Sequence, residues 1–406
     1  MTARQLSPPQ QAAIVLAGFL SLVVAMGIGR FAFTPMLPLM QRDGLIGTSA
    51  GALLASANYA GYFAGAMCAA HIRLPAPNLM RGSLVPIVIF TAAMGLLAHL
   101  PLWLALRFAA GVLSAWVLVG TSAWCLAQLA ASDKAAGSPV LAGLVYAGVG
   151  AGIAIAGVLC LAFAGTSTPA SSLWQYLGAI AGVFTLMVFG LVWWAGAGAA
   201  GTPVPPAANA IAPATSDRGL IVCYGCFGFG YILPATFIPV LGRMVIDDPV
   251  LFGWAWPVFG VTGALSTILA SVFLNRMSRV AVMSRCHFVM AIGAGLPAFS
   301  PSLPALLVSA VCVGGTFMVI TMAGYQEARV RGGSNPTRLM GLMTSAFAIG
   351  QIAGPLFSAL LAWSTVIDDK LSLRAGLLAA SVVLAVSGIW LRRAAQSNST
   401  AQGAQA

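Results

Sequence analysis

The sequence predicts an all-α, polytopic membrane protein with twelve transmembrane helices arranged as two pseudo-symmetric six-helix bundles. Three observations lead to this fold class: the composition, twelve apolar segments of membrane-spanning length, and one long connection in the middle of the chain. Of the 406 residues, 60% are hydrophobic and 7% are charged, whereas about 25% of the residues of a soluble domain are charged. A soluble fold of this length could not keep its surface hydrated with so few charges.

Each predicted helix is a mostly apolar segment, because about 20 such residues are needed to cross the hydrocarbon core of a bilayer. The twelve segments are residues 11–40, 47–71, 82–99, 101–131, 139–165, 172–196, 219–244, 250–275, 280–299, 303–328, 338–363 and 371–391. The first is too long for the apolar core of a secretory signal peptide, and no small-residue cleavage site follows it. We therefore expect it to be retained as the first helix.

The connection after the sixth segment predicts the domain organisation. Residues 1–196 form an N-terminal bundle, residues 197–218 a linker, and residues 219–406 a C-terminal bundle with a short tail. The linker is rich in Pro, Ala and Gly, which is typical of a flexible connection rather than a packed element.

The two bundles also contain an internal repeat. The string GIGRFAFTPMLP in the first helix corresponds to GFGYILPATFIP in the seventh, and three positions match at a constant offset of 201 residues: Gly27, Gly29 and Pro38 with Gly228, Gly230 and Pro239. Segments interrupted by Gly and Pro at corresponding positions of two halves point to the binding site of a transporter.

The net charge of +11 is distributed as the positive-inside rule requires rather than as a nucleic-acid-binding face. With both termini in the cytoplasm, thirteen Lys and Arg residues fall on the cytoplasmic side: Arg4, Arg73, Arg81, Lys134, Arg218, Arg276, Arg279, Arg285, Arg329, Arg331, Arg338, Arg392 and Arg393. Four fall outside: Arg42, Arg243, Lys370 and Arg374. We therefore expect both termini and the linker to be cytoplasmic.

Two further arginines, Arg30 and Arg107, lie within predicted helices. A charged side chain near the bilayer centre costs about 2.5–3.5 kcal/mol on insertion scales and is retained mostly where it faces a cavity or a partner. At about 1.5 Å rise per residue, the two arginines lie roughly 15 Å and 9 Å below the outer ends of their helices, close enough in depth to share one site. Pro35 and Pro38 weaken the backbone bonding near Arg30, so we expect the first helix to be interrupted beside a cavity.

The strings GIGRFAFTPMLP, ANYAGYFAGA and WAWPVFG resemble the YbfB/YjiJ-type group of bacterial transporters in the major facilitator superfamily. The resemblance covers essentially the whole chain. It implies a secondary transporter that works by alternating access. The loop NRMSR resembles the superfamily's D-R-x-G-R loop, and HIRLPAPNLMR occupies the matching place in the first half. By this resemblance, Arg73, Arg276 and Arg279 are gating residues, and Arg107 with Gly111 resembles the R-x-x-x-G motif of the fourth helix.

Eight residues are candidates for substrate binding: Arg30, Thr34, Tyr59, Arg107, Trp116, Tyr231, Trp256 and Gln351. A polar stripe on the fourth helix contains Arg107, Ser114, Thr121 and Cys125, and such residues either line a cavity or join helices. Gln351 could equally bond substrate or a neighbouring helix. Each arginine could instead bond helix-end carbonyl groups, and about half of the aromatic candidates, which also include Tyr62 and Trp254, are packing or interfacial residues.

The remaining chemical groups mainly exclude functions. All eight carboxylates lie in loops or near helix ends, so Glu327 is the nearest candidate for proton coupling, although it could be an end residue that snorkels beside Arg329. The natural counter-ion of Arg30 is then an anionic substrate. Cys223 and Cys226 form a C-x-x-C within a helix, where two small packing residues are expected rather than a redox or metal site. The three histidines are expected at interfaces.

The sequence thus predicts a monomeric secondary transporter in the bacterial inner membrane, driven by an ion gradient and carrying a small organic, anionic solute. It requires no cofactor or metal and binds no nucleic acid. A non-transporting receptor or scaffold is the alternative, but it would be expected to carry a sizeable soluble domain. An intramembrane enzyme would need a catalytic acid, base or metal cluster in the membrane, and no segment provides one.

Overall fold

The computed structural model describes residues 6–69, 71–72, 74–96, 98–131, 139–195, 215–245, 253–333, 335–363 and 369–403. Within these residues all regular elements are helices, which confirms the all-α fold class. They are α1 (Pro8–Leu22), η1 (Val23–Phe31), α2 (Phe33–Arg42), α3 (Thr48–Ala69), α4 (Ala76–Ala93), α5 (Leu100–Ala131), α6 (Pro139–Phe163), α7 (Ala170–Trp194), α8 (Thr215–Val245), α10 (Ala255–Phe273), α11 (Arg279–Phe299), α12 (Leu303–Arg331), α13 (Pro336–Trp363) and α14 (Asp369–Gly403).

Elements α1, η1 and α2 join into one 35-residue helix, so the described elements supply one long helix for each predicted segment. By length and composition, 11 helices in the described part of the chain could cross a membrane. The exception is α3, whose 22 residues are long enough but include Asn58, Tyr59 and Tyr62. Residues 197–214 of the predicted linker lie outside the described residues, and residues 215–218 form the first turn of α8.

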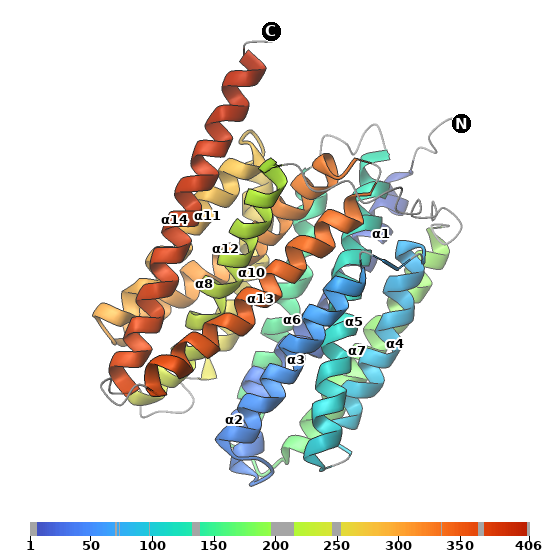
Figure 1. Ribbon diagram of the computed structural model, residues 1–406. Helices are drawn as coiled ribbons and strands as arrows, with labels where there is room; N and C mark the ends of the chain where they lie inside the picture. Colours follow the sequence, from blue (N-terminus) through green and yellow to red (C-terminus); the bar gives the residue numbers. More distant parts are fainter. Residues whose placement is uncertain are drawn as a thin grey trace.

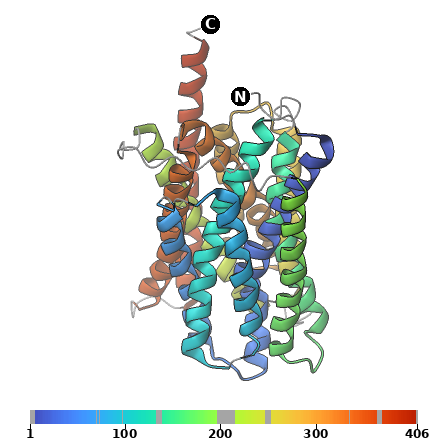
Figure 2. The same ribbon diagram turned by 90° about the vertical axis from the view of Figure 1, so that its right-hand side faces the viewer.

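The helices run roughly parallel to one long axis, and α1 begins at the same face of the molecule at which α14 ends (Figure 1). We call this the terminal face. Helix α5 packs against α3 and α4, and α1 packs against α5, α6 and α7. In the second half, α8 packs against α13 and α14, and α11 against α12 and α14. The last part of α14 projects beyond the other helices at the terminal face (Figures 1 and 2).

The two sets of helices meet along α6 and α10, and also where α3 contacts α13. Gly143, Gly150 and Gly157 recur at heptad spacing on α6 and face α10. A Cβ atom built on Gly150 would lie 2.5 Å from the carbonyl oxygen of Gly260, so only glycine permits this approach of the two backbones. Small residues commonly allow such close packing between membrane helices. This glycine stripe is therefore a packing surface.

The first helix contains the predicted interruption, but in a different form and place. Nine residues, Val23–Phe31, are π-helical, and α-helical geometry resumes before both prolines. π-Helical turns widen the helix and are frequent at functional sites. Gly27 allows this segment to approach α6, because a Cβ atom there would lie 2.5 Å from the carbonyl carbon of Gly152.

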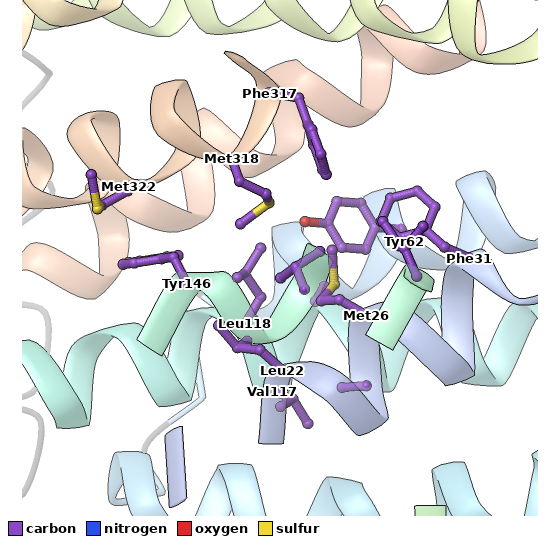
Figure 3. Packing of buried hydrophobic residues seen from close by; sticks show 14 of the residues in the cluster. Leu22, Met26, Phe31, Tyr62, Val117, Leu118, Tyr146, Phe317, Met318 and Met322 are labelled. Carbon is purple, nitrogen blue, oxygen red and sulfur yellow. The ribbon is translucent and has the colours of Figure 1, made fainter. Parts of the chain in front are cut away.

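Apolar side chains fill the centre of the molecule where η1, α5, α6 and α12 meet (Figure 3). Leu22 and Met26 from the first helix, Leu118 from α5, Tyr146 from α6 and Met318 from α12 belong to one buried cluster. The centre between the two halves is thus closed by side chains in this structure, and the charged groups described next are surrounded by apolar neighbours.

Candidate functional site

Arg30 lies near the end of η1, and only 2% of it is exposed. Its guanidinium carbon lies 3.6 Å from the ring centroid of Tyr62 on α3, a distance typical of a cation–π contact. Its Nη2 donates a hydrogen bond to Oε1 of Gln351 on α13, across the boundary between the two sets of helices. Among the described residues, its Nε and Nη1 atoms have no hydrogen-bond acceptor. The guanidinium is therefore fixed in place but keeps N–H groups free for a ligand.

Arg107, on α5, is 4% exposed and has a different role from Arg30 in this structure. Its two terminal nitrogens donate to the carbonyl oxygens of Gly29 and Arg30, each at 3.1 Å. Pro35 has no amide hydrogen and cannot bond a carbonyl of the preceding turn, so the bonds from Arg107 satisfy backbone acceptors of the first helix. Asn58 of α3 in turn donates to the carbonyl oxygen of Arg107 at 2.9 Å.

The C-terminal half contributes three polar groups to the same region. Gln351 is fully buried, and its Nε2 atom has no acceptor. The hydroxyl group of Tyr231 on α8 and the Nε1 atom of Trp256 on α10 are also buried without a partner. A buried polar group without a hydrogen bond costs about 1–3 kcal/mol. Like Arg30, these groups therefore have capacity to bond a ligand.

The other substrate-binding candidates differ in their contacts. Thr34 is half-buried on α2, one turn after Arg30. Tyr59 is half-buried on α3 and lies close enough to Arg30 and Arg107 to interact with both charges. Trp116 donates its Nε1 hydrogen to the carbonyl oxygen of Gly65 at 3.0 Å, so it joins α5 to α3.

Two other members of the polar stripe on α5, Ser114 and Cys125, contact neighbouring helices. The hydroxyl group of Ser114 donates to carbonyl oxygens of Ala25 at 2.9 Å and Ala110 at 2.6 Å. Gly111 packs against the backbone of α3, and Cys125 lies against Gly18 of α1. These contacts confirm the helix-packing interpretation for Ser114 and Cys125.

Within the described residues, no carboxylate forms an ion pair with Arg30 or Arg107. The described ion pairs lie near helix ends. Glu327 on α12 accepts from Nε of Arg331 at 2.7 Å and lies 3.7 Å from a guanidinium nitrogen of Arg279. Arg331 also lies 3.6 Å from Asp217 at the start of α8. These four residues, the Glu327 cluster, join α8, α11 and α12 at the terminal face.

A cavity of about 760 Å³ opens beside the Glu327 cluster, between the ends of α5 and α6 and the ends of α10, α11 and α12. Arg276, Arg279 and Arg329 line it, together with Gln326. Arg276 is exposed in the connection between α10 and α11. Arg73, the matching gating candidate in the first half, lies outside the described residues. The structure thus brings Arg276, Arg279 and Glu327 to one end of the boundary between the halves, far along α12 from the Arg30 region.

The structure adds one residue to the site and corrects one expectation. Asn58 lies beside the Arg30 region with Tyr62, which is already an aromatic candidate, and the only hint of Asn58 in the sequence is an amide in the middle of the α3 segment. The interfacial placement of His287 is wrong, because this residue is fully buried two turns into α11. Its ring nitrogens lie 2.8 Å from the carbonyl oxygen of Met283 and 3.5 Å from that of Cys223 on α8.

Comparison with known proteins gives a family. The profile of a family described as "Uncharacterised MFS-type transporter YbfB" matches residues 22–392. No curated protein matches the chain by sequence.

Solved structures with a similar fold are transporters of low sequence identity. The human organic anion transporter MFSD10 (TETRAN) has a TM-score of 0.68 and 16% identity, over 95% of this chain and 100% of that one. The proton:xylose symporter XylE has a TM-score of 0.70 and 11% identity, over 94% and 95%. The E. coli fucose:proton symporter FucP has a TM-score of 0.65 and 13% identity, over 93% and 97%. At these identities the similarity shows the fold alone.

Proposed function

We propose, from the premise that this chain belongs to the YbfB-type family of major facilitator superfamily transporters, that its substrate is a small organic anion bound by Arg30. The family and the fold make the protein a multi-pass membrane transporter of the secondary type. We infer the chemical class of the substrate from the site.

One observation carries the proposal: Arg30 is buried, ordered and without a counter-ion among the described residues. Leaving one charge of a buried pair unpartnered typically destabilises a protein by about 3–5 kcal/mol. An anion that enters this region would supply the missing charge and would accept hydrogen bonds from Nε and Nη1 of Arg30. Free N–H groups on Gln351 and Trp256 and the hydroxyl group of Tyr231 are further donors in the same region.

Transport would follow from the position of this site between the two halves. Arg30 belongs to the half that spans residues 1–196, and Gln351 to the half that spans residues 219–406. An anion bound to Nε and Nη1 that draws the guanidinium away from Gln351 would weaken the contact between the halves. The halves could then separate on one side of the membrane, with the 197–218 linker keeping them connected.

The energy source that fits this site is an ion gradient coupled at one of two places. The first place is Glu327 on α12. Its ion pair with Arg279, which lines the cavity, places it beside that cavity at the terminal face. The other possible carrier is a proton on the substrate itself. XylE and FucP, which share this fold, are proton symporters.

The membrane placement that we propose is the bacterial inner membrane, with the terminal face in the cytoplasm and the protein acting as a monomer. The thirteen-to-four distribution of Lys and Arg supports this orientation. Reporter fusions placed in the linker and after Ala406 test it. Activity of a cytoplasmic reporter at both positions is expected, and activity only of a periplasmic reporter would reverse the orientation.

The test of the anion site is a ligand screen on purified protein, followed by binding to wild type, Arg30→Lys and Arg30→Ala at equal folded yield. Lysine keeps the charge but cannot reproduce the two parallel hydrogen bonds that a guanidinium gives a carboxylate. We expect weaker binding in Arg30→Lys and loss of binding in Arg30→Ala. Equal binding by all three proteins, or a cationic ligand, would overturn the proposal.

A further inference from the structure

We propose that the anion bound by Arg30 carries an aromatic ring, which packs against an aromatic surface of the C-terminal half. This inference rests on the proposed function and adds the chemical class of the part of the substrate that does not carry the charge. It follows from the arrangement of the rings that lie next to the Arg30 region.

Rings from three helices form a continuous surface, which we call the aromatic wall. Tyr231 of α8 stacks on Phe317 of α12 with ring centroids 5.3 Å apart. Phe317 stacks on Phe259 of α10 at 5.2 Å, and Phe259 stacks on Trp256 at 5.3 Å with an angle of 6° between the planes. Aromatic pairs prefer offset-stacked or edge-to-face geometry, and these three contacts are all stacked, so the four rings form one stack whose edges are available for further ring contacts.

The aromatic wall reaches the Arg30 region through the ring of Phe31. Phe31, which follows Arg30 in the chain, contacts Phe317 edge to face, with centroids 6.4 Å apart and planes at 85°. The guanidinium carbon of Arg30 lies 5.2 Å from the Phe31 ring. Figure 3 shows Phe317 of α12 pointing toward Phe31 and Tyr62, which come from the first helix and α3. This ring contact lies on the boundary between the two halves, as the bond between Arg30 and Gln351 does.

Separation of the halves would therefore break two contacts together. Phe31 would leave Phe317, and Gln351 would leave Arg30, because in both pairs one residue belongs to each half. The opened space would have free N–H groups at one end and ring edges along one side. An anion with an aromatic ring satisfies both, because it restores the charge pair and the ring–ring contact.

The polar groups near the wall favour a ring over a hydroxyl-rich body. The unpartnered side-chain atoms there are the Tyr231 hydroxyl and Nε1 of Trp256, and Nε1 can only donate. A sugar acid has several hydroxyl groups, each of which needs partners when it is removed from water. The buried residues of the wall are Tyr231, Phe259 and Phe317, and they cannot supply that many hydrogen bonds.

Binding to the full-length purified protein tests this inference with five probes of similar size. They are 3-phenylpropionate, 3-cyclohexylpropionate, glucuronate, 3-phenylpropanamide and 2-phenylethylamine. We expect 3-phenylpropionate to bind roughly three- to tenfold more tightly than the saturated ring acid, the range that corresponds to one aromatic contact. Glucuronate should bind more weakly than both. The neutral amide and the amine should not bind at the same concentrations.

Two variants assign the preference to the wall. Phe317→Leu should remove the advantage of the aromatic acid over the saturated acid and leave the saturated acid bound. Trp256→Leu should reduce the same ratio, and this half-buried residue provides a second variant should Phe317→Leu fold poorly. Phe357→Leu is the matched control, because its ring pairs with Phe229 at 5.8 Å outside the wall, and the ratio should stay at its wild-type value.

The outcomes separate the two proposals. If acids bind and the amide and amine do not, but the ring gives no advantage or the wall variants leave the ratio unchanged, the aromatic inference is wrong and the anion site stands. If the amide or the amine binds as well as the acid, the anion site itself is wrong, and the aromatic inference falls with it.

Discussion

Arg30 and Gln351 form a hydrogen bond between two buried side chains that are 321 residues apart in the chain and lie on opposite sides of the boundary between the halves. Gln351 can accept this bond but cannot neutralise the charge of Arg30. The pair therefore adds one hydrogen bond to the contacts between the halves and leaves the charge of the guanidinium without a counter-charge. A substitution that adds or removes a charge at either residue should therefore change both anion binding and stability.

Gln351→Glu should convert this bond into an internal ion pair. The new carboxylate would supply the counter-charge that we assign to the substrate, so anion binding should fall by more than tenfold. The unfolding temperature in detergent should rise, because a buried pair replaces an unpaired charge. Ligand binding and thermal unfolding measure the two effects.

The control for that prediction is Gln128→Glu, the same change at a half-buried position on α5 away from Arg30. It should not raise the unfolding temperature or block binding. A Gln351→Glu protein that binds the anion as well as wild type would show that the substrate does not use this side of Arg30.

Arg107→Lys should separate structural from substrate-binding roles. Arg107 bonds two carbonyl oxygens of the first helix at once, and a lysine ammonium lacks the planar fork that spans both. We expect a loss of about 1–3 kcal/mol of stability with anion affinity largely retained in the folded fraction. Arg30→Lys should show the reverse, with affinity lost and stability retained. If both variants lost affinity to the same degree at equal folded yield, Arg107 would belong to the anion site.

Much of the fold could be predicted because an apolar segment of about 20 residues satisfies all its backbone hydrogen bonds in a bilayer when it is helical. The ends were less predictable. Helix α4 begins at Ala76 rather than at 82, and Pro77 in its first turn is a start signal that hydropathy does not use. Helix α14 continues to Gly403 rather than stopping at 391, because polar residues can extend a helix beyond the membrane.

The candidate site was predictable as residues but not as contacts. Arg30 could be identified because a charged side chain in an apolar membrane segment is costly and is retained mostly at functional positions. The sequence of one helix is enough to identify it. Its partners Tyr62 and Gln351 lie on two other helices, and the rotation of those helices decides which side chains face inward. The burial of His287 was missed for the same reason, since position along a helix does not give the direction of a side chain.

Asp43 should make the end of α2 sensitive to acid. Burial alone would raise the pKa of this carboxyl, but hydrogen bonds from Arg42 and from the amide of Ala170 hold the pKa below its usual value. Stability from a carboxylate with a lowered pKa is complete above the unfolded pKa, near 3.9, and is lost as pH falls through the folded pKa. The contact joins the end of α2 to the start of α7.

Hydrogen exchange of the backbone near Ala170 between pH 6 and pH 3 measures this effect. Wild type should lose protection in the acid part of the range, after correction for the intrinsic rate, and Asp43→Asn should show the lower protection at all pH values. A wild-type profile parallel to that of Asp43→Asn down to pH 3 would contradict the prediction.

Glu327→Gln should abolish accumulation driven by a pH gradient while anion binding and exchange without a gradient remain. The reason is that Glu327 holds Arg331 and Arg279 at the terminal face, so a proton that reaches it would release both arginines. Uptake and counterflow in proteoliposomes measure the two activities. Asp217→Asn is the matched control, because it removes one carboxylate from the same cluster, and it should keep gradient-driven uptake. Unchanged gradient-driven transport by Glu327→Gln would leave the proton on the substrate or another ion as the coupling group.

Gly150→Ala should impair the packing of the two halves more than any single polar change described above. The added Cβ atom would lie 2.5 Å from the carbonyl oxygen of Gly260 and 2.8 Å from the carbonyl carbon of Gly263. Both atoms belong to the backbone of α10 and cannot move as the end of a flexible side chain could, so α6 and α10 must separate. Overpacking of this kind typically costs about 1–3 kcal/mol.

Gly190→Ala on α7 is the matched control, because no described atom outside its own turn of helix lies within 4 Å of its Cβ position, and alanine there should be neutral or stabilise the helix by up to about 1 kcal/mol. Thermal unfolding of the two variants should therefore move in opposite directions or differ clearly in size. Equal unfolding temperatures for Gly150→Ala, Gly190→Ala and wild type would show that α6 and α10 are not in close contact in the resting protein.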